Sequence, residues 1–199
     1  MKGAPIALSI LVLLNGCTSI GGAVKQPPSA WNVDLNAREP NHCPNISATF
    51  SASGERDSEP WRGAGKGVTF EDVWAVSIRT VARGSKYVRI EARPPSNLRI
   101  ILERDNGASE MLEKLSGYEK TVSCENGAFV VFLRRRFTGM HSGPIEETHR
   151  YNFVQTLDGS LAIRSLVTYK ATSVAMRLTG LAGEDSITEF WFRFPKVAN

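Results

Sequence analysis

Long apolar runs and blocks of one charge sign are both missing from this sequence. Its most apolar stretch, residues 6–14, is far shorter than the roughly 20 residues that a membrane-spanning helix needs. The 24 Lys and Arg are interspersed with 20 Asp and Glu along the whole chain, which leaves a net charge of only +4. We therefore expect neither a multi-pass membrane protein nor a nucleic-acid partner, and 199 residues of this composition predict one globular domain.

The common motifs of enzymes and metal sites are missing as well. There is no Gly-x-Ser-x-Gly, no His-Glu-x-x-His and no Cys-x-x-Cys. Residues 63–67 are rich in glycine, but Pro60 stands where a P-loop has its first glycine, so we expect a flexible connection there. The alternative is an anion contact through the backbone amides that precede the predicted helix. We predict no catalytic site, no cofactor and no metal. A hydrolase stays open as an alternative, because catalytic triads are defined by geometry and not by spacing.

Histidine is scarce, with only His42, His141 and His149 in the chain. None of them lies at the spacing of metal ligands on a helix. His149 follows Glu146 and Glu147 in a segment that leads into a strand, and we expect it to be a solvated surface group.

The first residues differ in composition from the rest of the chain. Lys2 is their only charge, the apolar residues 6–14 follow, and Gly16 precedes Cys17. A charged start, a short apolar region and a small residue before the cleavage site are typical of a signal peptide. The sequence therefore predicts a signal peptide at residues 1–16.

The segment Leu14-Asn15-Gly16-Cys17 resembles the lipobox of bacterial lipoproteins. The resemblance implies a diacylglycerol thioether on Cys17, cleavage after Gly16, and acylation of the new amino terminus by a fatty acid such as palmitate. Three acyl chains exceed the two signals that stable anchoring needs, so the expected partner is a membrane. Thr18, in place of Asp, implies sorting to the outer membrane, with the domain facing the periplasm.

Residues 17–42 are predicted to form the lipidated cysteine and a flexible tether. They are rich in glycine, proline and polar side chains and have no sustained period. Docking of Trp31 and Val33 on the domain would shorten the reach of this tether. The single β-rich globular domain is then predicted to span residues 43–199.

Two cysteines remain for the folded domain, Cys43 and Cys124. An exported protein meets an oxidising compartment, where an even pair is expected to bond. We predict a disulfide between them that closes a loop of 81 positions. The alternative is two buried free thiols.

One amphipathic helix is predicted after residue 69. Its apolar face has the spacing i, i+3, i+4 and consists of Phe70, Val73, Trp74, Ser77, Ile78 and Val81. Thr69 and Asp72 are spaced as in a capping box, and Gly84 stands where a left-handed C-terminal cap belongs.

After residue 84 the apolar period changes from 3.6 to 2, which is typical of strands. The candidate strands are 88–93, 98–102, 129–137, 151–157, 161–169, 174–178 and 187–194. The turn signals between them are Pro94-Pro95-Ser96-Asn97, Asn106-Gly107, Asn126-Gly127 and Asp158-Gly159. We predict an α+β fold that is mainly β, in which one N-terminal helix packs on a curved antiparallel meander sheet or partial barrel.

Arg134, Arg135 and Arg136 form a short basic run. On a strand, Arg134 and Arg136 share one face and Arg135 points to the other. One interpretation is a strand end that emerges into solvent. The other is a contact for an anionic surface, either lipid phosphate or a cell-wall polymer.

Three further segments carry a looser resemblance. Residues 43–50, residues 157–161 and Trp191-Phe192-Arg193-Phe194 together look like small proteobacterial outer-membrane lipoproteins of uncharacterised function. The resemblance implies structural cysteines and a β-rich domain, and it carries over no active site.

Three hypotheses for function follow. The first is a non-enzymatic envelope lipoprotein whose domain binds an envelope protein, the cell wall or lipid. The second is a carrier that holds a lipid or other apolar ligand in a curved sheet covered by the Trp74 helix. The third is an envelope hydrolase.

Overall fold

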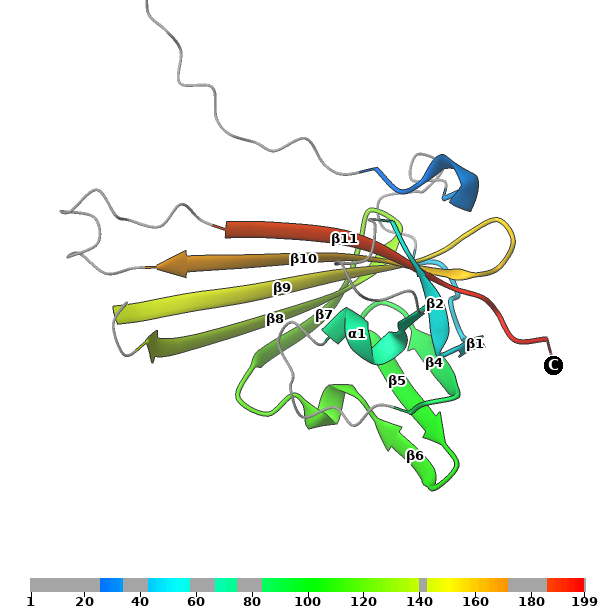
Figure 1. Cartoon of the computed structure of the whole chain (residues 1–199), viewed down its shortest axis with the longest axis horizontal. Coiled ribbons are helices and arrows are strands. Elements are labelled where there is room, and N and C mark those ends of the chain that lie inside the picture. The colour runs from blue at the N-terminus through cyan, green and yellow to red at the C-terminus, as the bar shows by residue number, and fades with distance from the viewer. Residues whose placement is uncertain are drawn as a thin grey trace, which may run out of the picture.

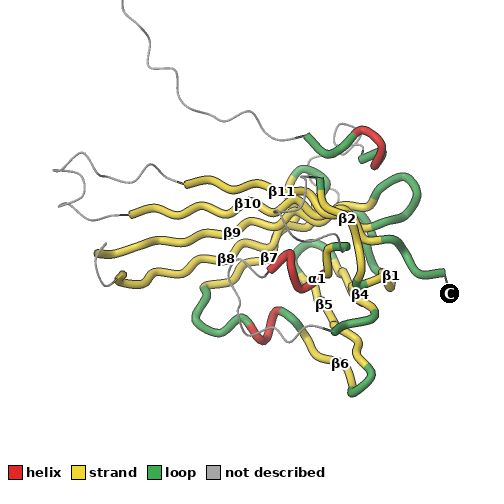
Figure 2. Tube along the Cα trace, in the orientation of Figure 1, coloured by secondary structure: helices red, strands yellow, loops and turns green. Residues whose placement is uncertain are grey.

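The computed structural model describes residues 26–33, 43–57, 67–74, 84–139, 143–171 and 186–198. The chain is mainly β, and its strands form two antiparallel sheets of four and seven strands (Figures 1 and 2). The structure thus has two sheets where the sequence predicted one. No closed barrel forms among the described strands.

The smaller sheet has the strand order β1-β4-β5-β6. Its strands are β1 (Ala48–Ser51), β4 (Tyr87–Arg93), β5 (Asn97–Arg104) and β6 (Gly107–Glu110). In β4 and β5, alternate apolar residues such as Val88, Ile90 and Ile100 are buried, whereas Arg and Glu occupy the opposite face. This alternation is the pattern of an antiparallel sheet with one solvated face.

The larger sheet has the order β3-β2-β11-β10-β9-β8-β7. Its strands are β2 (Ser53–Arg56), β3 (Val68–Thr69), β7 (Glu119–Glu125), β8 (Ala128–Gly139), β9 (Gly143–Gln155), β10 (Leu161–Ala171) and β11 (Ser186–Phe194). From β7 to β11 each strand pairs with the next along the chain, which confirms the predicted meander. At the β7–β8 turn, Asn126 and Gly127 have φ of 48° and 71°, as a type I′ hairpin requires.

Two segments of chain join the sheets. β1 continues through Ala52 into β2 of the larger sheet, and β11 continues into residues 195–197, which pair with β1. The Ser51 amide donates to the Pro195 carbonyl at 2.8 Å. A Cβ at Gly54 would lie 2.3 Å from the Arg193 carbonyl oxygen, so this crossing needs a glycine.

The main core lies between the sheets, on the face of the larger sheet that we call the inner face. The helix α1 (Phe70–Trp74) contributes two rings to it: Phe70 packs on Phe194 with centroids 5.1 Å apart, and Trp74 packs on Tyr151 at 4.1 Å. The Thr69 amide donates to Asp72 Oδ2 at 2.8 Å, which is one half of the predicted capping box.

Several predictions about elements lie outside the described residues. They are the second half of the predicted helix, the candidate strand 174–178 and most of the glycine-rich residues 63–67. Gly84, the predicted cap, has φ of +107°. β9 begins at Gly143, well before the start expected at residue 151, and the short η2 (Leu112–Lys114) precedes β7.

The opposite, outer face of the larger sheet is covered at one end by the N-terminal segment. The turn η1 (Ser29–Trp31) places Trp31 against Ala128, Ala162 and Trp191, and Trp31 is only 6% exposed. The two alanines leave room for the indole ring. This confirms the docking of Trp31 expected from the sequence. None of the helices among the described residues has the length and apolar character to cross a bilayer.

Candidate functional site

The predicted disulfide is present, with the Cα atoms of Cys43 and Cys124 5.6 Å apart. It ties the segment before β1 to the edge strand β7, and Cys43 is itself buried in the main core. Cys17, the predicted lipidation site, lies outside the described residues, as do His42 and His141.

The arginine run alternates between the two faces of β8 as predicted. Arg134 and Arg136 both pair with Glu146 on the outer face, at 2.7 and 2.8 Å. Arg135 points to the inner face and pairs with Glu147 at 2.7 Å. All three guanidinium groups therefore already have a carboxylate partner within the chain, and their contact with an anionic surface stays a prediction.

A buried polar cluster occupies the inner face of β8 and β9. We call it the inner cluster, and it consists of Tyr118, Arg135, Glu147, His149 and Tyr151. Glu147, His149 and Tyr151 point the same way because alternate residues of a strand share a face. His149 has no exposed side-chain surface, so the expectation of a solvated histidine is wrong. β9 pairs with β8 and β10 along this whole stretch, and both neighbours help to cover the ring.

The hydrogen bonds of the inner cluster run from one residue to the next. His149 Nε2 lies 2.8 Å from Glu147 Oε1, and His149 Nδ1 lies 3.4 Å from the Tyr151 hydroxyl. Arg135 donates to Glu147 Oε2 from Nε and Nη2, at 3.1 and 2.7 Å. The Arg135 guanidinium also lies 4.9 Å from the ring centroids of Tyr118 and Phe137. Both oxygens of the buried carboxylate are thus engaged.

Burial and neighbouring charges together set the charge states in the inner cluster. It lowers the pKa of His149, with Glu147 opposing and Arg135 reinforcing this shift. Burial favours a raised pKa at Glu147, but the hydrogen bonds and charges of His149 and Arg135 outweigh it and the pKa is lowered. Burial and Glu147 also raise the pKa of Tyr169 to about 12. At neutral pH the cluster therefore holds anionic Glu147, cationic Arg135 and a neutral His149 that donates from Nε2.

Carboxylate, imidazole and hydroxyl in a row resemble the order of a catalytic triad, but this arrangement is closed. The Tyr151 ring packs on Trp74 at 4.1 Å, and Tyr151 is fully buried. Within the described part of the chain, no group of three or more His, Cys, Asp or Glu side chains is placed to hold a metal ion. The inner cluster can hold β8 and β9 together, and its Glu147 and His149 can change their protonation state with pH.

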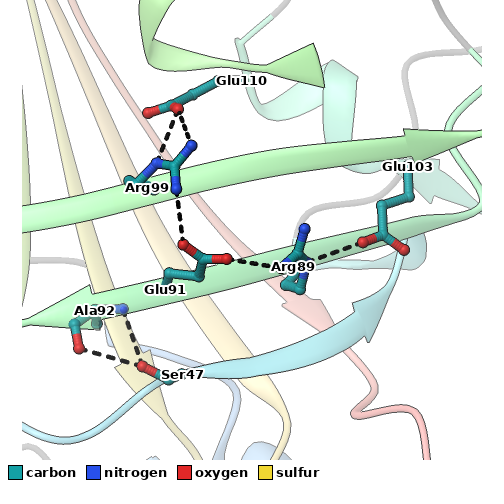
Figure 3. A network of polar contacts seen from close by, with 7 residues as sticks. All are labelled: Ser47, Arg89, Glu91, Ala92, Arg99, Glu103 and Glu110. Atoms are coloured by element: carbon teal, nitrogen blue, oxygen red, sulfur yellow. Dashed lines mark hydrogen bonds and ion pairs between the residues drawn. The ribbon is translucent and has the colours of Figure 1, made fainter. Parts of the chain in front are cut away.

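The second candidate is the solvated face of the smaller sheet. There, Arg and Glu side chains form a continuous chain of ion pairs across β4, β5 and β6 (Figure 3). Arg89 binds Glu103 at 3.0 Å and Glu91 at 2.7 Å. Arg99 binds Glu91 at 3.0 Å and Glu110 at 2.8 Å. The pairs fix these side chains relative to one another on a rigid sheet.

A shallow depression lies at one end of this face. It measures about 80 Å³ and is lined by Glu91, Arg93, Asn97 and Arg99. Arg93 could not be singled out from the sequence, because its surroundings depend on which residues of β4 and β5 lie opposite each other. The alternation of Arg and Glu along β4 was the only available signal.

Comparisons with protein-family models, with curated proteins and with solved structures found no match to this chain. The assignment of a function therefore depends on the geometry of these sites and on the chemistry of the sequence.

Proposed function

We propose that the chain is a membrane-anchored envelope lipoprotein that acts as a non-enzymatic binding module in the periplasm. The acyl chains on Cys17 anchor it, and the solvated face of the smaller sheet contacts its partner. The single observation that carries this proposal is the docking of Trp31 on the outer face of the larger sheet.

Trp31 fixes the point at which the tether meets the domain. Fourteen positions separate it from Cys17, so the lipid lies within roughly 50 Å of the outer face. The smaller sheet packs on the opposite, inner face through core residues such as Ile90 and Ile100 (Figure 1). This arrangement supports presentation of the charged face away from the point of attachment.

The interior supports binding over catalysis or carriage. In the inner cluster the Glu147 carboxylate binds both the Arg135 guanidinium and the His149 imidazole, and Trp74 packs on the Tyr151 ring. Aromatic rings fill the described space between α1 and the larger sheet, which leaves the carrier hypothesis without support there. The strands shared between the sheets at Ala52 and Pro195 favour a partial barrel packed with side chains.

Site-specific photo-crosslinking in cells tests the proposed contact face. A photoreactive residue replaces Asn97 on the smaller sheet in the full-length lipoprotein. The matched control replaces Thr168, which lies on the outer face of the larger sheet. We expect reproducible adducts of defined mass from position 97 and none from position 168.

The anchor is tested separately by labelled palmitate. The wild-type chain should incorporate the label, and Cys17→Ser should not. Equal crosslinking from both positions would contradict the proposed face, whereas label in the Cys17→Ser variant would contradict the anchor.

A further inference from the structure

We propose that the depression lined by Glu91, Arg93, Asn97 and Arg99 binds a single carboxylate group of the partner. This inference deepens the proposed function, on which it rests, by naming the chemistry that the charged face recognises. Three features of the charged residues on β4, β5 and β6 support it: their ion pairs, their register and the charge that stays uncompensated.

The acidic residue of the depression already pairs with two arginines. Glu91 Oε1 accepts from Arg89 Nη1 at 2.7 Å, and Glu91 Oε2 accepts from Arg99 Nη1 at 3.0 Å (Figure 3). Each oxygen of this carboxylate thus faces a guanidinium. Both oxygens of Glu91 are engaged with Arg89 and Arg99, and neither forms an ion pair with the nearby Arg93.

Arg93 is exposed, and its guanidinium forms no ion pair or side-chain hydrogen bond within the described part of the chain. This distinguishes it from the run Arg134–Arg136, in which every member has a carboxylate partner. A guanidinium beside a depression is a ready donor for a planar oxyanion.

The register of β4 and β5 brings further donors to the same place. Arg93 lies opposite Asn97, and Glu91 lies opposite Arg99, so both arginines and the amide share one end of the sheet face. Glu110 holds Arg99 through Nε at 2.9 Å and Nη2 at 2.8 Å. Arg99 is therefore held in place before a ligand arrives, which reduces the entropy cost of binding for this donor.

The charge balance selects a carboxylate over a phosphate. Arg93 is the one arginine of the lining without a carboxylate partner among the described residues, so the depression offers one uncompensated positive charge, which matches one carboxylate. A phosphate monoester carries about −1.5 to −2 charges at neutral pH and would meet Glu91 at close range. A depression of about 80 Å³ has room for one carboxylate group, so it contacts only a small part of a larger ligand.

Titration with acetate, followed by amide chemical shifts of the full chain in a zwitterionic detergent, tests this site. We expect saturable shifts at Arg93 and Asn97, with millimolar affinity. Arg93→Ala should weaken acetate binding roughly tenfold or more, because it removes a charge-assisted donor. Arg136→Ala is the matched control: it removes the same charge from an exposed residue of the other sheet and should leave binding unchanged.

Three outcomes would overturn the inference: shifts that never saturate, equal weakening by Arg136→Ala, or tighter binding of inorganic phosphate than of acetate. Arg93→Gln removes the charge but keeps a polar side chain at this exposed position, and it should weaken acetate binding as Arg93→Ala does, which guards against a local folding defect as the cause. If acetate fails to bind while crosslinking from position 97 persists, the binding module stands and the carboxylate inference falls.

Discussion

At the scale of single residues, the neighbouring Arg135 and Arg136 differ in how deeply their carboxylate partners are buried. Arg135 faces a carboxylate that is almost completely buried, since the side chain of Glu147 is only 2% exposed. Arg136 is 66% exposed and pairs with Glu146 in solvent. Neighbours in sequence thus differ because the strand turns one side chain inward and the next one outward.

Replacing each arginine by alanine should reveal this difference. Arg135→Ala leaves Glu147 without its cation and should lower the free energy of unfolding by about 2–3 kcal/mol. This value is below the usual cost of breaking a fully buried ion pair, because Arg135 is partly exposed. Arg136→Ala should lower it by about 0.5 kcal/mol or less. Urea unfolding at neutral pH measures both, and equal losses would contradict the closed inner cluster.

The buried histidine predicts a dependence of stability on pH. Burial keeps the pKa of His149 below its ordinary value of 6.5, so the unfolded chain binds the proton more readily than the folded one. Stability is therefore complete above pH 6.5 and falls as the pH drops below it. Glu147, whose pKa is also lowered, adds a further loss as the pH falls below its ordinary 4.5.

The variant His149→Gln isolates the first of these effects. Glutamine donates to Glu147 but does not titrate, so its loss of stability between about pH 7 and pH 5 should be smaller than that of the wild type. Urea midpoints across this range provide the measurement. Identical pH profiles for the two proteins would show that His149 is not the group responsible.

Strand alternation was enough to predict which arginine would face away from the other two. It was not enough to predict their partners, because Glu146 and Glu147 meet the arginines only through the register of β8 and β9. His149 was expected to be solvated because the strand was predicted to begin only at residue 151, whereas β9 already begins at Gly143. Polar residues alternate there since the outer face of β9 is solvated while its inner face is buried.

At the scale of elements, the N-terminal segment is held to the sheet by one side chain. Trp31→Ala should detach it locally without unfolding the domain, because the rest of the core does not depend on the indole. The expected result is faster hydrogen exchange of the Leu157 amide, which donates to the Asn32 carbonyl at 3.4 Å. Ser29→Ala, at an exposed position of the same turn, is the control, and unchanged exchange in Trp31→Ala would contradict the docking.

The starts of β8 and β10 could be predicted, because Asn126-Gly127 and Asp158-Gly159 precede strands of period 2. The division into two sheets could not, since the same period describes both. The change of sheet occurs at Ala52 and Pro195, where the chain passes from one sheet to the other without a turn signal. This crossing of the chain needs glycine at position 54 because the Arg193 carbonyl oxygen lies close to it, and Arg193 is far away in sequence.

At the scale of the whole molecule, the disulfide adds a covalent cross-link to the two chain segments that already join the sheets. Cys43 precedes β1 of the smaller sheet, and Cys124 lies on the edge strand β7 of the larger one. The bond keeps the two cysteines together in the unfolded chain and so closes a loop of 81 positions there. In the chain-entropy model a loop of this length contributes about 4 kcal/mol.

The double variant Cys43→Ala with Cys124→Ala should lower the free energy of unfolding by about 4 kcal/mol. The native fold should persist, because the hydrogen bonds of residues 195–197 to β1 still join the sheets. Urea unfolding of the oxidised wild type and of the double variant measures the loss, and far-ultraviolet circular dichroism checks the fold. The reduced wild type separates the lost bond from the altered side chains: reduction should reproduce most of the loss. A double variant as stable as the oxidised protein would mean that noncovalent contacts alone hold the sheets together.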